Sequence, residues 1–434
     1  MKPHPRLIVR SLLLTAASLF LAGGCSFAPR VPDYAKGNRA FIAYWPPEKG
    51  SERLRLAVKD NIDIKGVVTT AGSQYLAVTG RPAAKDAACL AIARSRNVQF
   101  VGKANLSEFA VTPSGINEYF GTPKNPFDRW IKLIPGGSSS GSAVAVASGL
   151  ADVAFGTDTA GSVRVPAASC GVVGLKTTHG LVPLDGVRPV EPEHLDTVGP
   201  LARDIAGTVQ GMDLLQAGFA SRYAAAKSTN PSARSIRVGR LRLKGTNPSV
   251  DEAVDRALAA AGFTVIPLDD AFREKWDLAQ KDGNTVAGGG VWLSNRQYRY
   301  LYGVSAQTTS AILTGRLIHL TGYPAALKRR AAWQRTLRSV YRKVDLIALP
   351  TLQTIPPPIP PNLRIGVLEA LVLDMQNTAA VSFAGNPALA MPIPLEDSSV
   401  PVTSLQLVGP PRSEADLLNA GRLVELAVKI PKRR

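Results

Sequence analysis

The sequence predicts an α/β fold, and three observations carry this prediction. The chain has 434 residues, of which 45% are hydrophobic, and this is enough material for one large core or two domains. From about residue 54 onward, short stretches with the two-residue period of strands alternate with stretches of helical period. The chain contains no internal repeats, and such alternation is typical of a sheet that is covered by helices.

The N-terminal elements follow from local patterns. Apolar residues alternate over 54–59, which predicts a strand. Small apolar residues recur at helical spacing over 83–97, and a short strand is expected to begin at Phe100–Val101. Residues 141–149 are small and compatible with a helix, and 153–155 have the composition of a buried strand.

The C-terminal elements are predicted in the same way. Residues 251–262 form an amphipathic helical pattern, which a strand over 263–266 follows. A long basic helix is expected over 324–343, with a strand at 346–349 directly after it. The Pro-rich stretch 356–361 is predicted to be a rigid turn or loop, because it is too short for a domain linker.

The N-terminus has the layout of a secretory signal peptide over residues 1–24. A basic start precedes an apolar run over 11–22 that is too short for a comfortable membrane span. The small residues before Cys25 resemble a bacterial lipoprotein cleavage box, although Ala22 stands where Leu is usual. We therefore expect an exported, periplasmic lipoprotein that is anchored to the membrane through Cys25, with a tether and irregular lead-in over 25–50. The alternative is an ordinary signal peptide in which Cys25 is incidental.

The distribution of charge and the cysteines argue against a nucleic-acid-binding protein, a disulfide-stabilised protein and a zinc-binding protein. The 51 basic and 33 acidic residues give a net charge of +18, which would fit nucleic acid or an anionic surface. The basic clusters at 328–330 and 432–434 are short and lack interleaved aromatic residues, so a soluble basic protein without a nucleic-acid partner is favoured. Cys89 and Cys170 do not make a disulfide framework and are expected to be unpaired buried thiols. No zinc-type spacing occurs, so no metal is predicted.

Residues 135–176 carry the strongest chemical signal. They read PGGSSSGSAVAVASGLADVAFGTDTAGSVRVPAASCGVVGLK. Gly136 and Gly141 have the separation of a phosphate loop, but Ser142 stands where that loop needs Lys. A flexible linker is excluded because a small-residue helix follows at once. Glycine-rich backbone beside a helix start allows close approach to a ligand or to another segment of the chain.

The segment resembles the signature of the amidase signature family. That signature is a Gly-Gly-Ser-Ser-x-Gly-Ser run, a small-residue helix and a Gly-Thr-Asp-x-x-Gly-Ser loop, followed by Arg, Pro and Cys-Gly before Gly-Leu-Lys. Upstream, residues 58–60 match the family's Val-Lys-Asp motif. The resemblance covers roughly residues 50–428, is weak over 205–340, and departs at Thr177, where Pro is usual.

The resemblance implies an amidase signature fold: a large central mixed β-sheet flanked by helices on both faces, in a single domain over residues 51–434. It also implies hydrolysis of an amide C–N bond. In the family, the first Ser of the Gly-Gly-Ser run bridges the nucleophile and a lysine, which makes Ser138 the bridge, Ser162 the nucleophile and Lys59 the base. The two serines are 24 residues apart, in agreement with the family pattern.

A lysine base is chemically reasonable here. A serine hydroxyl is a weak nucleophile until a base removes its proton, and no His is well placed by motif to do so. His179, in a Thr-His-Gly turn, is expected to be structural. Lysine can take this role if it is neutral, and burial lowers the pKa of an ammonium group. Without its two partners, Lys59 would be read as a solvated strand lysine.

The family also implies how the site is supported. The Gly137–Ser138 peptide bond is expected to be cis, and Asp158 and Arg164 are expected to pair in a structural role. Neither an organic cofactor nor a metal is required. Four backbone N–H groups would stabilise the oxyanion, namely those of Thr159, Ala160, Gly161 and Ser162.

Two other functions stay open at this point. One is the amidotransferase component that uses this domain to release ammonia from glutamine for tRNA-linked synthesis, although an exported chain would not meet tRNA. The other is an inactive exported binding protein that kept the fold. The expected partner is a small-molecule or peptide amide, and the sequence does not determine which amide or which oligomeric state.

Overall fold

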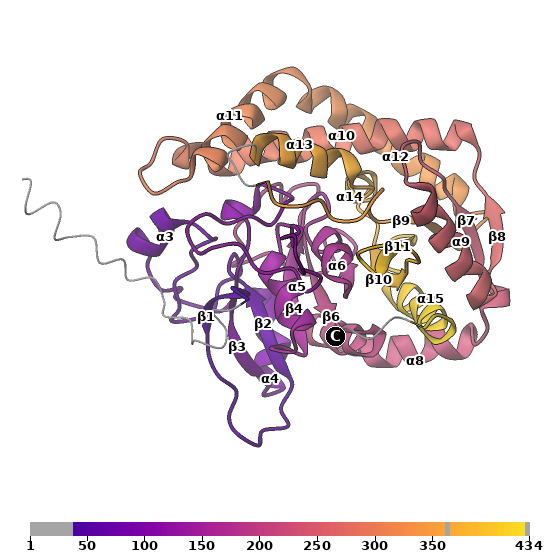
Figure 1. The fold of residues 1–434 in the computed structure, drawn as a ribbon, viewed down its shortest axis with the longest axis horizontal. Helices are drawn as coiled ribbons and strands as arrows, with labels where there is room; N and C mark the ends of the chain where they lie inside the picture. The colour runs from indigo at the N-terminus through magenta and orange to yellow at the C-terminus, as the bar shows by residue number, and fades with distance from the viewer. Residues whose placement is uncertain (1–37, 361–364, 430–434) are drawn as a thin grey trace, which may run out of the picture.

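The computed structural model describes residues 38–360 and 365–429 of the chain. These residues contain a mixed β-sheet of eleven strands (Figure 1). The strand order is β1-β3-β2-β4-β6-β5-β10-β11-β9-β7-β8. β2 is parallel to its neighbours β3 and β4, and β7 is parallel to its neighbours β8 and β9. From β4 to β9 in this order, each strand is antiparallel to the next. The strands are β1 Phe41–Tyr44, β2 Arg55–Lys59, β3 Gln99–Ala104, β4 Val153–Asp158, β5 Val173–Lys176, β6 Thr197–Ala202, β7 Arg237–Arg240, β8 Thr264–Pro267, β9 Leu346–Pro350, β10 Ala388–Pro394 and β11 Val402–Val408.

Helices cover both faces of this sheet, as the resemblance implied. In Figure 1, α10 to α13 lie along one side of the molecule, and α8 and α15 lie along the other. The helices are α3 Gln74–Thr79, α4 Ala91–Ser95, α5 Ser140–Ala147, α6 Arg164–Cys170, α7 Ile205–Leu215, α8 Phe219–Thr229, α9 Pro248–Ala261, α10 Asp270–Asn295, α11 Ala306–Thr321, α12 Tyr323–Val340, α13 Ile365–Met375, α14 Ala379–Ala384 and α15 Glu414–Ala427. Short 3₁₀ turns lie at Ala88–Leu90, Glu108–Ala110, Ala233–Ser235 and Arg296–Tyr298.

The alternation of side chains along the strands decides which core each residue joins. In β2, Leu56 and Val58 belong to the core beneath α7, α9 and α15, whereas Ala57 belongs to the core beneath α5 and α6. The residues of β9 also alternate between two cores. Leu346 belongs to the core beneath α7, α9 and α15, and Ile347 belongs to a core formed with α10, α12 and α14. Successive residues of a strand face opposite ways, so each strand is buried on both faces.

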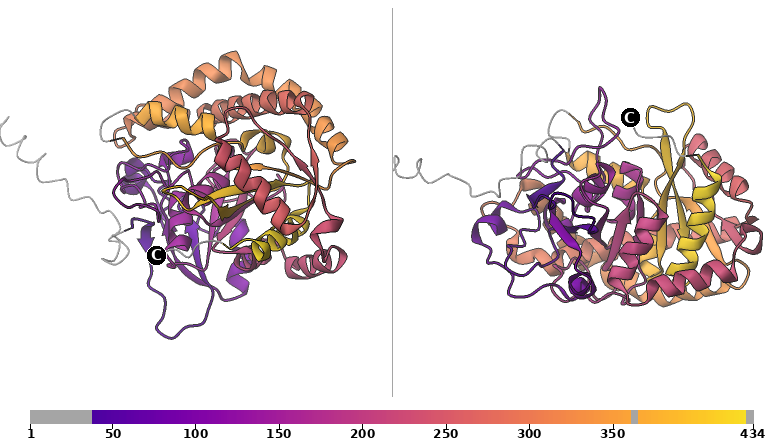
Figure 2. Two further views of the ribbon diagram at one scale, coloured as in Figure 1. Left: turned by 45° about the vertical axis from the view of Figure 1, so that its right-hand side comes forward. Right: turned by 90° about the horizontal axis from the view of Figure 1, so that it is seen from below.

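The views in Figure 2 place the two ends of the sheet. Seen from below, the indigo and purple strands of the N-terminal part lie on one side and the yellow strands β10 and β11 on the other. α5 packs on β2 and β4 near the first end, and α6 packs on β5, β10 and β11. β2 and β4 are parallel neighbours, so their carboxyl ends meet at one edge of the sheet. Such an edge is where open α/β sheets place their ligands.

Most elements agree with the sequence predictions. Every predicted strand is present, and the helices expected near 141–149, 251–262 and 324–343 are α5, α9 and α12. Stretch 356–360 is irregular, as expected. The described part of the chain contains no helix that is both long and apolar enough to cross a bilayer.

Two local predictions are wrong. The lead-in over 25–50 is not wholly irregular, because Phe41–Tyr44 forms the edge strand β1, which pairs antiparallel with β3. Four residues are too few to show a period. The helix expected over 83–97 is restricted to a 3₁₀ turn and α4, because the N–H groups of Ala83 and Ala87 donate to the carbonyls of Val67 and Asp63 instead.

Cys89 and Cys170 are both buried, and the structure joins them to no disulfide. This agrees with the prediction of buried thiols. The predicted signal peptide, Cys25 and the basic cluster at 432–434 lie outside the described residues.

Candidate active site

Lys59 is the last residue of β2, and its side chain is completely buried. Its Nζ donates to Ser138 Oγ at 2.7 Å and to Thr157 Oγ1 at 2.8 Å. Burial lowers the pKa of Lys59 to about 7, although the carboxylates of Asp158 and Asp196 act in the opposite direction. A lysine of this kind is neutral in a large fraction of molecules near pH 7, and can then accept a proton.

Ser138 lies on the turn that leads into α5, and the Gly137–Ser138 peptide bond is cis, as expected from the resemblance. The Ser138 carbonyl accepts the N–H of Ser107 at 3.2 Å, and the Gly137 N–H donates to the carbonyl of Pro113 at 2.6 Å. A Cβ on Gly137 would lie 2.7 Å from the backbone nitrogen of Gly115, so only glycine fits at this crossing of two segments.

Ser162 lies in the turn between β4 and α6, which we name the Ser162 loop (residues 158–164). Its carbonyl accepts the N–H of Ser139 at 3.2 Å, so the two serine-bearing segments are in direct contact. The Ser162 side chain is half-buried, and its hydroxyl has no hydrogen bond to any described residue. The structure thus forms the predicted contact of Lys59 with Ser138 but not a hydrogen bond between Ser138 and Ser162. Catalytic hydrogen bonds are commonly looser without substrate.

The Ser162 loop presents unused backbone donors. Within the described residues, no acceptor takes the N–H groups of Thr159, Ala160, Gly161 or Ser162. Thr159 and Gly161 are buried and Ala160 and Ser162 are half-buried, and backbone N–H groups in such places are nearly always paired. A cluster of unpaired ones beside a serine hydroxyl is suited to receive an anionic oxygen. Gly161 has φ of +147°, a conformation that residues with a side chain rarely adopt.

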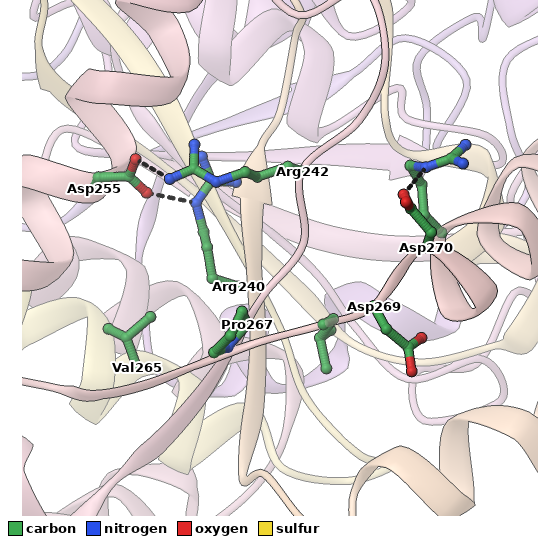
Figure 3. A pocket seen from close by; sticks show the side chains of 9 residues that line it. Arg240, Arg242, Asp255, Val265, Pro267, Asp269 and Asp270 are labelled. Carbon is green, nitrogen blue, oxygen red and sulfur yellow. Dashed lines mark hydrogen bonds and ion pairs between the residues drawn. The ribbon is translucent and has the colours of Figure 1, made fainter.

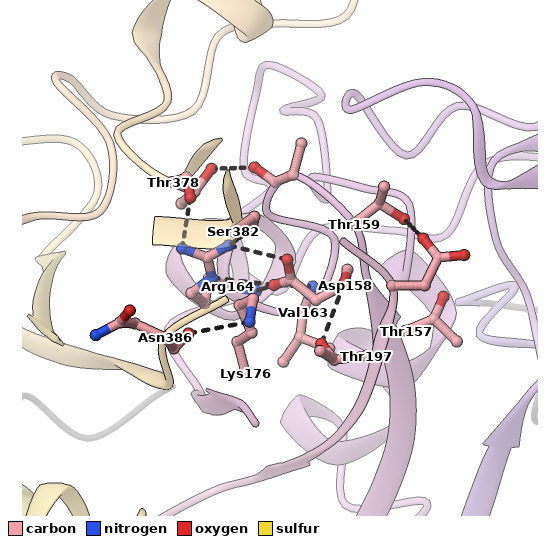
Figure 4. Close-up of polar contacts among 12 residues, drawn as sticks. Thr157, Asp158, Thr159, Val163, Arg164, Lys176, Thr197, Thr378, Ser382 and Asn386 are labelled. Carbon is pink, nitrogen blue, oxygen red and sulfur yellow. Dashed lines mark hydrogen bonds and ion pairs between the residues drawn. The ribbon is translucent and has the colours of Figure 1, made fainter. Parts of the chain in front are cut away.

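An ion pair between Asp158 and Arg164 closes the Ser162 loop, as predicted (Figure 4). Both side chains are fully buried, and Arg164 Nη2 lies 2.9 Å from Asp158 Oδ1. Burial raises the pKa of Asp158, but the charge and hydrogen bonds of Arg164, together with Lys176 and the N–H of Val163, leave this pKa below its usual range. Arg164 also donates to the carbonyl of Thr378 at 2.9 Å and to Gln406 Oε1 at 2.8 Å. Arg164 therefore connects the Ser162 loop, through Asp158, to the C-terminal part of the chain, through Thr378 and Gln406.

Two residues of the site, Thr157 and Asp196, were given no role from the sequence. Thr157, between Gly156 and Asp158 of the signature, accepts the second Lys59 hydrogen bond and a bond of 3.1 Å from Asn61 Nδ2. Because Thr157 lies inside the Gly-Thr-Asp motif of the signature, the sequence could have indicated it as a site residue. Thr159 Oγ1 donates to Asp196 Oδ1 at 2.6 Å, which anchors the start of the loop.

Two further buried lysines surround the site. Lys103 forms an ion pair of 3.0 Å with Asp60, the residue after Lys59. Burial lowers the pKa of Lys176 to about 7, and the neighbouring Arg164 adds to this effect. Lys176 Nζ donates to the carbonyls of Thr177 and Asn386, so it joins β5 to the segment before β10 (Figure 4). Neither lysine contacts Ser138 or Ser162.

A cavity of about 430 Å³ lies elsewhere, beside β7 and β8 (Figure 3). Its arginines are already paired: Arg240 and Arg242 contact Asp255, and Arg273 contacts Asp270. None of its lining residues is a serine or a lysine, so the cavity offers no chemistry of the kind found around Ser162. Across residues 38–360 and 365–429, no group of three or more His, Cys, Asp or Glu side chains could hold a metal ion.

The fold and the signature segment around Lys59, Ser138 and Ser162 define an enzyme of the amidase type. Residues 54–418 match the model of the family described as Amidase, and the chain belongs to this family. It is 33% identical over 410 residues to the A-type component of the Glutamyl-tRNA(Gln) amidotransferase of Halobacterium salinarum, covering 85% of this chain and 94% of that protein. It is also 33% identical over 401 residues to a 2-amino-5-chloromuconic acid deaminase of Comamonas testosteroni, covering 86% and 81%.

Solved structures agree with this placement. The native peptide amidase of Stenotrophomonas maltophilia superposes with a TM-score of 0.68 at 27% identity, covering 87% of this chain and 84% of that one. The weak sequence match over 205–340 therefore did not mark a different fold.

Proposed function

We propose that this protein is an amidohydrolase that cleaves a carboxylic amide C–N bond through an acyl-enzyme on Ser162. The observation that carries the proposal is the hydrogen bond of 2.7 Å between Lys59 Nζ and Ser138 Oγ, which joins two fully buried side chains. A buried lysine whose pKa is lowered to about 7 and that contacts a serine hydroxyl is typical of a functional site.

The reaction would begin with two coupled proton transfers. Neutral Lys59 takes the proton of Ser138, and Ser138 takes the proton of Ser162, whose oxygen attacks the amide carbonyl carbon. The carbonyl oxygen becomes negative and is stabilised by the N–H groups of the Ser162 loop. The C–N bond then breaks, and the proton returns from Lys59 through Ser138 to the leaving nitrogen.

Water completes the cycle. The same relay removes a proton from a water molecule, which attacks the acyl-enzyme carbonyl and releases the carboxylic acid. Ser162 regains its proton through Ser138. No step requires a group from outside the chain other than substrate and water.

The substrate class is tested with a panel of aryl, fatty, peptide and small aliphatic amides, with ammonia or amine release as the readout. The likeness to a structure described as a peptide amidase supports including C-terminal peptide amides. We expect turnover of at least one class by the wild type and none by Ser162→Ala. An exposed control, Ser148→Ala on the far end of α5, should retain wild-type turnover. Equal turnover in Ser162→Ala and wild type would refute the proposal.

A second function is favoured by the relative that is the A-type component of a Glutamyl-tRNA(Gln) amidotransferase. On that alternative, the same site would release ammonia from glutamine for a partner protein. Purified chain that hydrolyses amides other than glutamine without a partner supports the hydrolase. Glutamine hydrolysis that appears only after addition of the other amidotransferase components supports the alternative. A chain that neither turns over an amide nor reacts with a serine probe would be the inactive binding protein.

We also propose that the protein is exported and held at a membrane by lipid on Cys25, without a nucleic-acid partner. The basic start, the short apolar run and the small residues before Cys25 support this. Export also weighs against the amidotransferase alternative, which requires tRNA.

A further inference from the structure

Thr378 precedes α14 and is completely buried against the Ser162 loop, 218 positions away from Ala160 in the sequence (Figure 4). Its hydroxyl donates to the carbonyl of Ala160, and its own carbonyl accepts from Arg164 Nη1 at 2.9 Å. One residue from the C-terminal part of the chain therefore contacts the loop at two points.

The hydroxyl of Thr378 does not have the role that its position predicts. Thr378 is the N-cap residue of α14, where a Thr hydroxyl ordinarily accepts an N–H of the first helical turn. No such bond is made here. The N–H of Ala380 is satisfied instead by Gln280 Oε1 of α10, at 3.0 Å. The Thr378 hydroxyl is thus left available to donate to the loop.

The bond to Ala160 has a geometric consequence for Gly161. The peptide bond between these residues is trans, since the single cis bond of the described residues is Gly137–Ser138. In a planar trans peptide, the C=O and N–H groups point in opposite directions. Holding the Ala160 carbonyl toward Thr378 therefore directs the Gly161 N–H away from Thr378. This N–H is one of the unpaired donors of the loop.

Because residue 161 is a glycine, the direction of its N–H has to be fixed by a neighbouring residue. Glycine rotates freely about its backbone bonds, so the Ala160–Gly161 peptide could turn over and exchange its carbonyl for its N–H. A carbonyl in that place would repel an oxyanion. Thr378 also limits the space, because a Cβ on Gly161 would lie 2.3 Å from Thr378 Oγ1. The hydrogen bond selects one orientation of this peptide, and the position of Thr378 leaves no room for a side chain at residue 161.

We propose that Thr378 is a positioning residue that sets the direction of the Gly161 N–H and thereby stabilises the oxyanion of the reaction. The proposal rests on the proposed amidohydrolase function. Thr378 acts through the backbone and does not contact the reacting atoms.

The test compares Thr378→Val, which keeps the shape but lacks the donor, with Thr378→Ser, which keeps the donor. Removing an oxyanion donor outright costs about 10²–10³-fold in kcat, so misdirecting one of four should cost about 10- to 100-fold. We expect Thr378→Val to lose this much in kcat with KM within about twofold, since ground-state binding does not use the donor. Thr378→Ser should recover most of the loss.

A trifluoromethyl ketone analogue of whichever amide the wild type hydrolyses supplies the second readout. It forms a tetrahedral adduct with the nucleophile, so its affinity should fall in Thr378→Val by about the same factor as kcat/KM. The matched control is Thr351→Val. Thr351 is a buried threonine whose hydroxyl is bonded to Ser404 Oγ at 2.8 Å and has no hydrogen bond to the loop, so its loss should affect stability but neither kcat nor ketone affinity.

Any of four results would overturn the proposal. Wild-type kcat in Thr378→Val would remove the role of Thr378 while leaving the hydrolase intact. A loss of kcat without a loss of ketone affinity, or without recovery in Thr378→Ser, would show a merely structural role. A wild type that turns over no amide would refute the hydrolase itself, and the role of Thr378 with it.

Discussion

Lys59 Nζ lies 2.7 Å from Ser138 Oγ, and neither side chain is exposed to water. The contact joins the end of β2 to the turn before α5, across 79 positions of sequence. An ammonium in such a place loses its hydration, which favours the neutral amine. The pairing therefore places a proton acceptor at hydrogen-bond distance from a hydroxyl.

Activity should depend on pH through Lys59. Because the pKa of Lys59 is lowered to about 7, the amine is increasingly protonated below pH 7 and cannot take a proton. We expect log(kcat/KM) to fall with a slope of about one per pH unit below an apparent pKa of about 7. The pKa of Lys176 is also lowered to about 7, so Lys176→Met is the control, and it should keep this acid limb. A profile that stays flat down to pH 5 would count against a neutral lysine base.

The nucleophile can be identified by mass. Treatment with a fluorophosphonate should leave one covalent adduct on a peptide that contains Ser162, and Ser162→Ala should not be labelled. Lys59→Ala should be labelled about 10²–10⁴-fold more slowly, because that is the usual contribution of a general base. Circular dichroism would verify that both variants are folded. Labelling of another serine at the wild-type rate in Ser162→Ala would assign the nucleophile elsewhere.

The buried ion pair should matter for stability as well as for shape. Arg164→Met leaves Asp158 as an uncompensated buried charge and removes the ties to Thr378 and Gln406. We expect the free energy of unfolding in urea to fall by about 3–5 kcal/mol. Arg237→Met breaks the exposed ion pair with Asp345, which water and salt screen, and should lower the free energy of unfolding far less than Arg164→Met does. Equal losses in both variants would show that burial does not decide the effect.

Membrane attachment should depend on Cys25. We expect the wild-type chain in the membrane fraction and Cys25→Ser in the soluble fraction, because lipid on this residue is the proposed anchor. Fractionation of cells followed by immunoblotting measures this, with Cys89→Ser as a matched control that should remain with the membrane. A wild-type chain that is soluble and begins at another residue would refute lipidation.

The sequence alone was sufficient for the parts of this protein that local patterns describe. The strand β2 follows from the alternation of apolar residues over 54–59, and β4 follows from the apolar composition of Val153–Phe155, since both patterns report burial within a single element. The spaced signature likewise located Lys59, Ser138 and the Ser162 loop, because these residues stand in motifs that can be read without knowing where other segments lie.

Only the tertiary structure showed what surrounds them. Thr378 and Gln406 reach the Ser162 loop from 214 to 242 positions away, and no local pattern around either residue indicates a contact with that loop. Their contacts depend on the order in which the strands join the sheet, which places β10 next to β5 and β11 next to β10. Hydrogen bonds between segments distant in the chain are properties of that order, and a local sequence pattern does not record it.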